Sequence, residues 1–121
     1  MSSHFEAVVI DCANPRVVGE FWSQLLGEKL DGPDDAGDVW IDERGGCPGI
    51  LFQRVPEAKT VKNRLHIDLR PNDQDAEVVR AIGLGARHVD IGQKDVTWVV
   101  LADPEGNEFC ILRTRPLGTP D

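Results

Sequence analysis

Apolar positions in the first half of the chain follow a strand period, then a helical one. Residues 4–12, "HFEAVVIDC", are rich in valine and isoleucine and predict a strand. Residues 14–27 predict a helix, with asparagine suited to the N-cap, proline at the first helical position and glycine as the stop. Its apolar stripe is Val18, Phe21, Trp22 and Leu25. Two further strands are predicted at residues 38–42 and 49–55, separated by a turn-rich segment.

The second half opens on a strand whose two sides differ in polarity. In residues 64–70, "RLHIDLR", three apolar side chains alternate with polar ones that include His66 and Asp68. Successive side chains of a strand point to opposite faces, so His66 and Asp68 share the face away from the core. That face either meets bulk water or lines a cavity in which an imidazole and a carboxylate can act together.

A second helix and three short strands complete the predicted pattern. The helix is capped by Asn72 or Asp73 and runs to about residue 84. Its expected buried side chains are Ala76, Val79 and Ile82. The strands are predicted at residues 87–92, 97–103 and 107–113. Between the last two, "DPEG" at 103–106 has proline and glycine where a type I turn places them, which predicts a structural turn.

The two halves match each other at an offset of 57–59 residues. Both predict a strand, a helix and three shorter strands, and Trp40 and Trp98 occupy equivalent positions. This match indicates an internal duplication of a βαβββ unit. One copy could not cover both faces of its own sheet, so two copies are expected to fold together. We therefore predict an α+β fold in a single domain over residues 1–121. Two tandem modules, about 4–56 and 63–114, form a curved mixed sheet around a cup, with the helices outside.

Composition and charge narrow the classes of partner. The 121 residues carry a formal net charge of −8, with 13 basic and 21 acidic side chains. An acidic surface argues against nucleic acid and favours solubility or, secondarily, cationic small molecules. The three cysteines show no metal-type spacing and predict free thiols in a reducing cytoplasm. No leader-like segment and no membrane-length apolar run is evident, so a membrane partner is not expected.

Three segments, "NPRVVGEFWSQLLG", "RLHIDL" and "LADPEGNEFCIL", resemble the vicinal oxygen chelate superfamily. This is the superfamily of glyoxalases, bleomycin resistance proteins and extradiol dioxygenases. The longer stretch "LFQRVPEAKTVKNRLHIDLRP" is similar to its glyoxalase-like subgroup. The resemblance covers nearly the whole chain. It implies paired βαβββ modules, a small-molecule cavity inside each cup and a homodimer or tandem pair.

The resemblance also implies where a metal would bind. Active members use side chains from four strands, and the matching positions here are Ala7, Gln53, His66 and Cys110. His66 matches the expected histidine. Ala7 offers no donor atom, and Gln53 and Cys110 stand where active members usually have glutamate. This set suits Ni, Fe(II) or Mg poorly, although Cys110 and His66 could hold Zn with help from Asp68. Asp68 lies about 7 Å along the strand from His66, so it is better placed to orient His66 or hold a ligand. We expect no resident cofactor, with Zn, Ni or Fe at His66 as the alternative.

Six side chains are the candidate ligand-binding residues: His66, Gln53, Asp68, Cys110, Trp98 and Trp40. The two tryptophans either pack in the core or form an aromatic wall against a planar or cationic ligand. Cys110 is either a small buried thiol or, paired with His66, a nucleophile. His66 is either a hydrogen-bonded structural residue or part of the site.

Three functions stay open on this basis. The first is a protein that binds or sequesters a small organic molecule, with a degenerate metal site. The second is a metal-dependent lyase or isomerase of the glyoxalase type, in which a metal polarises a carbonyl and a carboxylate moves a proton. The third is a scaffold with an unused cup. A homodimer is expected in each case.

Overall fold

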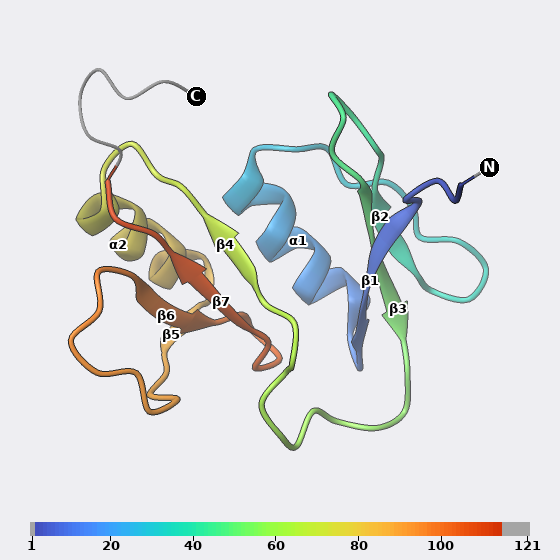
Figure 1. Ribbon diagram of the computed structural model, residues 1–121. Helices are drawn as coiled ribbons and strands as arrows, with labels where there is room; N and C mark the ends of the chain where they lie inside the picture. The colour runs from blue at the N-terminus through green and yellow to red at the C-terminus, as the bar shows by residue number, and fades with distance from the viewer. Residues whose placement is uncertain (1, 115–121) are drawn as a thin grey trace. The chain divides into compact units, whose positions relative to one another are not determined.

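Two mixed β-sheets, each with one helix, make up the structure, a computed structural model that describes residues 2–114 (Figure 1). The elements are β1 (Ala7–Cys12), α1 (Pro15–Leu26), β2 (Val39–Ile41), β3 (Gly49–Arg54), β4 (Ile67–Leu69), α2 (Gln74–Leu84), β5 (Arg87–His88), β6 (Val99–Ala102) and β7 (Glu108–Ile111). The chain divides into two compact units, Met1–Ala58 and Lys59–Asp121. The α+β class is confirmed, and the cup stays a prediction.

The first unit is built on the sheet β1-β3-β2, against which α1 packs (Figure 1). β1 runs parallel to β3, and β2 runs antiparallel to β3. Asn14 caps α1 by accepting a hydrogen bond from the backbone N–H of Val17, and Pro15 follows it. Gly27 ends the helix at φ 69°, a left-handed conformation that costs glycine nothing. The predicted apolar stripe is confirmed, because all four of its members are buried.

The two faces of the first sheet differ sharply in burial. Val39, Ile41 and Phe52 are almost fully buried on the face toward α1. Trp40 and Leu51 pair across β2 and β3 on the opposite face and are only half-buried. This alternation is the period of two that a sheet covered on one side produces.

The first unit lacks one of the three short strands that the repeat predicts. In its place Asp31 forms a single bridge with Trp40, through two backbone hydrogen bonds of 2.8 and 3.1 Å. Gly32 and Pro33 follow Asp31 at once, and proline has no N–H to donate to a ladder. The described part of this unit therefore has three strands.

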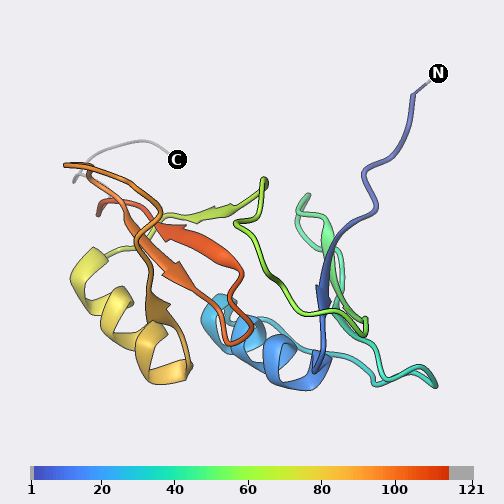
Figure 2. The same cartoon turned by 90° about the horizontal axis from the view of Figure 1, so that it is seen from below.

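The second unit has the full pattern, with the sheet β4-β7-β6-β5 (Figure 2). β4 runs parallel to β7, and β6 pairs antiparallel with both β7 and β5. The strands are shorter than predicted. The alternating segment 64–70 is a strand only at Ile67–Leu69, and Leu65 is 88% exposed, so it joins no core.

The buried side of α2 is not the one expected. Val79 is 73% exposed and Ile82 40%, whereas Ala81 is completely buried. Gln74 explains the difference, because its side-chain amide donates to the carbonyls of Thr97 at 2.8 Å and Ile111 at 3.1 Å. The side of α2 that carries Gln74 therefore faces the sheet. Ala81 lies two helical turns after Gln74 on the same side, so it is buried. Asp73, one of the two expected caps, accepts from Ala76 N.

Neither described helix combines the length and apolar character that a membrane span requires.

Candidate ligand site

His66, Asp68 and Cys110 come together in the second unit. Asp68 on β4 pairs directly with Cys110 on β7, and His66 comes one residue before β4 begins. His66 Nε2 lies 3.3 Å from Asp68 Oδ1. The imidazole nitrogen, carboxylate oxygen and thiol sulfur all lie within 4.8 Å of one another. We call these three residues the His-Asp-Cys cluster.

The cluster corrects one expectation about Asp68. Its distance from His66 along the strand suggested that Asp68 was better placed to orient His66 or hold a ligand than to share a metal with it. Since His66 lies outside the regular strand, its ring is not held perpendicular to the sheet and instead leans toward the carboxylate. Asp68 therefore both orients His66 and stands close enough to share a ligand with it.

The members of the cluster differ in exposure. The side chains of His66 and Asp68 are 44% and 49% exposed, whereas Cys110 is 4% exposed. Burial, and then the negative charge of Asp68, raise the pKa of the Cys110 thiol to about 11. The thiol therefore holds its proton at neutral pH. This weakens the interpretation of Cys110 and His66 as a nucleophilic pair, which needs a thiolate.

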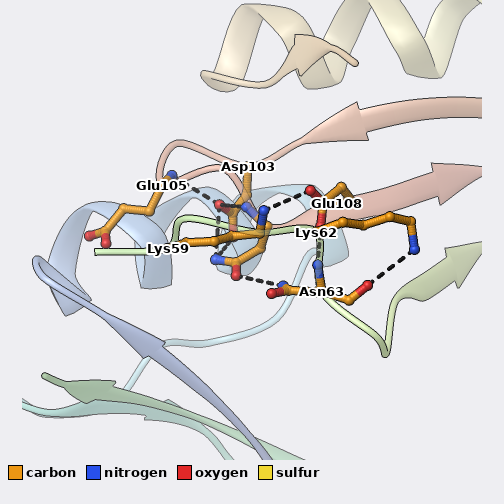
Figure 3. Close-up of polar contacts among 7 residues, drawn as sticks. Lys59, Lys62, Asn63, Asp103, Glu105 and Glu108 are labelled. Atoms are coloured by element: carbon orange, nitrogen blue, oxygen red, sulfur yellow. Dashed lines mark hydrogen bonds and ion pairs between the residues drawn. The ribbon is translucent and has the colours of Figure 1, made fainter. Parts of the chain in front are cut away.

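A polar network holds the segment before the cluster against the β6–β7 hairpin (Figure 3). The Glu108 carboxylate accepts from Lys59 Nζ at 2.7 Å and from the Asn63 backbone N–H at 2.9 Å. Asn63 also donates through its side-chain amide to Asn107 Oδ1 at 2.9 Å. Although burial acts in the opposite direction, these hydrogen bonds lower the pKa of Glu108, so it is ionised at neutral pH. The network fixes the chain three residues before His66 beside the strand that carries Cys110.

Trp98 stands beside an open depression of about 570 Å³ in the same unit. Trp98 is 41% exposed. The polar side chains that line this depression are His88, Asp90, Gln93 and Lys94. Val100 also lines it and pairs with Cys110 across β6 and β7. The four polar residues lie on β5 and in the connection that follows it, and this segment has no periodic pattern. Among the residues that line the depression, only Trp98 was a candidate from the sequence.

Gln53 and Trp40 belong to the first unit. Gln53 is exposed on β3 and pairs with Asp11 of β1, on the same face of the sheet as Trp40. This is the face away from α1, as expected of residues lining a cavity. Their convergence with the His-Asp-Cys cluster stays a prediction.

The donors present do not fit the four-strand metal set that the resemblance implies. Ala7 pairs with Gly49, so this point of the sheet offers no side-chain donor at all. Gln53 supplies at most a neutral amide oxygen, and Cys110 supplies a thiol. Hard divalent ions need several carboxylate or imidazole donors. A Mg, Mn or Ni site spread over these four positions is therefore not supported.

The three cysteines should differ in their reaction with a chromogenic disulfide reagent at mildly alkaline pH. Cys47 is exposed, whereas Cys12 and Cys110 are buried. We expect one fast thiol per native chain and two slow ones, because reaction needs an accessible thiolate and the raised pKa of Cys110 keeps it protonated. Cys47→Ser should abolish the fast phase and Cys110→Ser should retain it. A fast phase that disappears in Cys110→Ser would contradict this assignment.

Comparisons with known proteins bear on the family and the fold of this chain. A family model described as a glyoxalase-like domain matches residues 7–112. Among solved structures, the chain is similar to a glyoxalase/bleomycin resistance protein/dioxygenase family enzyme from Burkholderia phytofirmans PsJN, with 21% identity, coverage of 90% of this chain and 97% of that chain, and a TM-score of 0.69. It is also similar to TnmS3, an antibiotic binding protein from Streptomyces sp. CB03234, with 17% identity, coverage of 94% and 98%, and a TM-score of 0.63. A search of curated proteins gives no match.

Proposed function

Because the chain belongs to the glyoxalase-like domain family of the vicinal oxygen chelate superfamily, we propose that it binds a small organic ligand without needing a hard metal ion. The observation that carries this proposal is the donor set. Of the four positions at which active members hold a metal, one is Ala7 and one is a buried, protonated thiol. What remains is a polar cluster and, in the same unit, an exposed aromatic ring, which suits binding better than metal-assisted chemistry.

The second unit offers the features of a binding site. The depression beside Trp98 combines valine side chains with a few polar groups, as small-molecule sites do. Asp90 lines the depression together with Trp98 and Lys94, and Asp68 supplies a second carboxylate in the His-Asp-Cys cluster of the same unit. With a chain charge of −8, this favours a flat ligand that carries a positive charge. TnmS3, whose fold is similar, is an antibiotic binding protein, which supports the same class of function.

The test is a binding screen on chelator-treated protein. Melting scans against cationic glycopeptides, aromatic amines and acyl thioethers should reveal at least one compound that raises the melting temperature. Trp98→Ala should weaken its binding by about tenfold, since a ring stacked on a cation contributes about 1–2 kcal/mol. His66→Ala should also weaken it, whereas His4→Ala, a matched control on an exposed histidine of the first unit, should not.

Two outcomes would count against the proposal. If no compound class shifts the melting temperature, the scaffold interpretation gains. If a compound binds but Trp98→Ala and His66→Ala leave its affinity unchanged, the ligand site is elsewhere.

The alternative is a lyase or isomerase of the glyoxalase type. It is favoured by the contact between His66 and Asp68, which is the geometry of an imidazole oriented by a carboxylate for proton transfer. Loss of the hemithioacetal of methylglyoxal and glutathione is its direct assay. Turnover that disappears in His66→Ala would favour this alternative over simple binding. The homodimer and the cytoplasmic location stay predictions, and size-exclusion chromatography tests the first.

A further inference from the structure

We propose that the depression beside Trp98 binds an aromatic zwitterion, a flat ring that carries both an ammonium and a carboxylate group, as an aromatic amino acid does. This inference rests on the proposed function and deepens it, because that function asks only for a flat ligand with a positive charge. The added element is a negatively charged group on the ligand, and the residue that binds it is Lys94.

The apolar part of the depression comes from β6 and the residue before it. Val100 lines the depression and is buried, whereas Trp98, which directly precedes β6, is 41% exposed. The exposed part of the indole offers a surface on which another flat ring can stack. The volume of about 570 Å³ lies within the range of about 300–1,000 Å³ that is typical of small-molecule sites.

The connection after β5 forms the polar rim, and its own hydrogen bonds hold it in place. The Gln93 side chain accepts from the backbone N–H of Ile91 at 2.8 Å and donates to the carbonyl of Val89 at 3.1 Å. Asp90 Oδ1 accepts from the backbone N–H of Gly92 at 2.8 Å. Such contacts between side chains and the nearby backbone fix a turn, so the rim is ordered before a ligand arrives.

The same hydrogen bonds show which groups of the rim a ligand can use. Gln93 spends both ends of its amide on the backbone, so its role is structural. Asp90 uses Oδ1 for the turn and keeps Oδ2 for a donor on the ligand. Within residues 2–114, Lys94 forms no ion pair, either with Asp90 or with another acidic group. One depression therefore presents a carboxylate and an ammonium that do not neutralise each other.

This pair of opposite charges favours a zwitterion over a simple cation or anion. A ligand with only a positive charge pairs with Asp90 but sets its charge against that of Lys94. A ligand with only a negative charge is repelled by a chain of net charge −8. A zwitterion has no net charge to repel, and each of its ends finds a group of opposite sign.

The experiment compares three compounds that share one ring: L-tryptophan, tryptamine without the carboxylate, and indole-3-propionate without the ammonium. Each is titrated into the ¹⁵N-labelled full chain, and the indole N–H signal of Trp98 is followed, identified by its absence in Trp98→Phe. We expect L-tryptophan to bind about fivefold more tightly than either of the others, which is the upper range for one ion pair at an open site.

Variants assign the two charged groups. Lys94→Gln should lower the affinity for L-tryptophan to that for tryptamine and leave tryptamine binding unchanged. Asp90→Asn keeps an oxygen for the turn, and it should weaken L-tryptophan and tryptamine alike without affecting indole-3-propionate. Lys29→Gln is the matched control, since it makes the same charge change at an exposed lysine of the first unit, and all three affinities should stay as in the native chain.

The outcomes separate this inference from the proposed function. It is overturned if tryptamine binds the native chain as tightly as L-tryptophan, or if the difference between them persists in Lys94→Gln. It is also overturned if L-tryptophan leaves the Trp98 signal unmoved while a cation from the melting scans shifts it, and the proposed function then stands. If no compound of either set moves the signal, both fail.

Discussion

Trp22→Ala is expected to lower the free energy of unfolding by about 3–5 kcal/mol, because it empties a fully enclosed aromatic site. Trp22 is 1% exposed on the inner side of α1, and its ring meets that of Phe21 edge-on at a centroid distance of 5.5 Å. Against a total stability of about 5–15 kcal/mol for a domain of this kind, the loss is large. Urea unfolding followed by circular dichroism measures it without relying on tryptophan fluorescence.

Trp98→Ala is the matched control, since it removes the same side chain from the surface. Trp98 is 41% exposed and leaves no closed cavity when truncated. Its loss should change the free energy of unfolding by less than about 1 kcal/mol, in the range of surface substitutions. Equal destabilisation by the two variants would show that α1 does not form the core of the first unit.

Asp103→Ala is expected to lower the free energy of unfolding by about 3 kcal/mol, because it leaves several donors of one turn without their acceptor. Asp103 is fully buried, and its carboxylate accepts from the backbone N–H groups of Glu105 and Asn107 at 2.9 and 3.0 Å (Figure 3). The side-chain amide of Asn107 also donates to it, at 3.0 Å to Oδ2. Since Asn107 in turn accepts from Asn63, the loss should spread to the segment before His66. Urea unfolding measures the change.

Two further variants of this turn separate the carboxylate from the loop itself. Glu105→Ala keeps its backbone N–H on Asp103 and should cost little. Asp103→Asn keeps one acceptor oxygen but sets an amide N–H₂ against that of Asn107, so an intermediate loss is expected. If Asp103→Ala is no more destabilising than Glu105→Ala, the carboxylate does not hold the hairpin together.

Much of the fold could be predicted because local signals agree with one another. In α1, the cap at Asn14, the proline after it, the glycine stop and a dense apolar stripe all indicate one helix with one buried side. The turn at "DPEG" was predictable for the same reason, and Gly106 N does donate to Asp103 O at 2.9 Å. In α1 and in this turn, each of these residues favours one local structure only, so the sequence pattern has one interpretation.

The predictions that failed concern residues with two equally good roles. In α2, Ala76, Val79 and Ile82 recur every three residues, and Gln74 and Ala81 lie seven apart, so each set can share one side of a helix; hydrophobicity alone favours the former set. The deciding contact is that of Gln74 with backbone carbonyls of Thr97 and Ile111, far along the chain. Likewise, Leu65 fits the alternation of β4 but lies beyond the residues that find a partner on β7.

By itself, the sequence determined the α+β class, the family resemblance, the helix α1 and the residues worth testing, because these depend on periodicity, capping and turn chemistry within short windows. Only the tertiary structure decided that His66 and Asp68 meet Cys110 within 4.8 Å and that the thiol is buried. It also decided which side of α2 packs. The pairing of β4 with β7 joins residues 42 positions apart, as Asp68 with Cys110. Such a register, and the burial and pKa that follow from it, is a property of distant segments packed together and leaves no periodic trace along the chain.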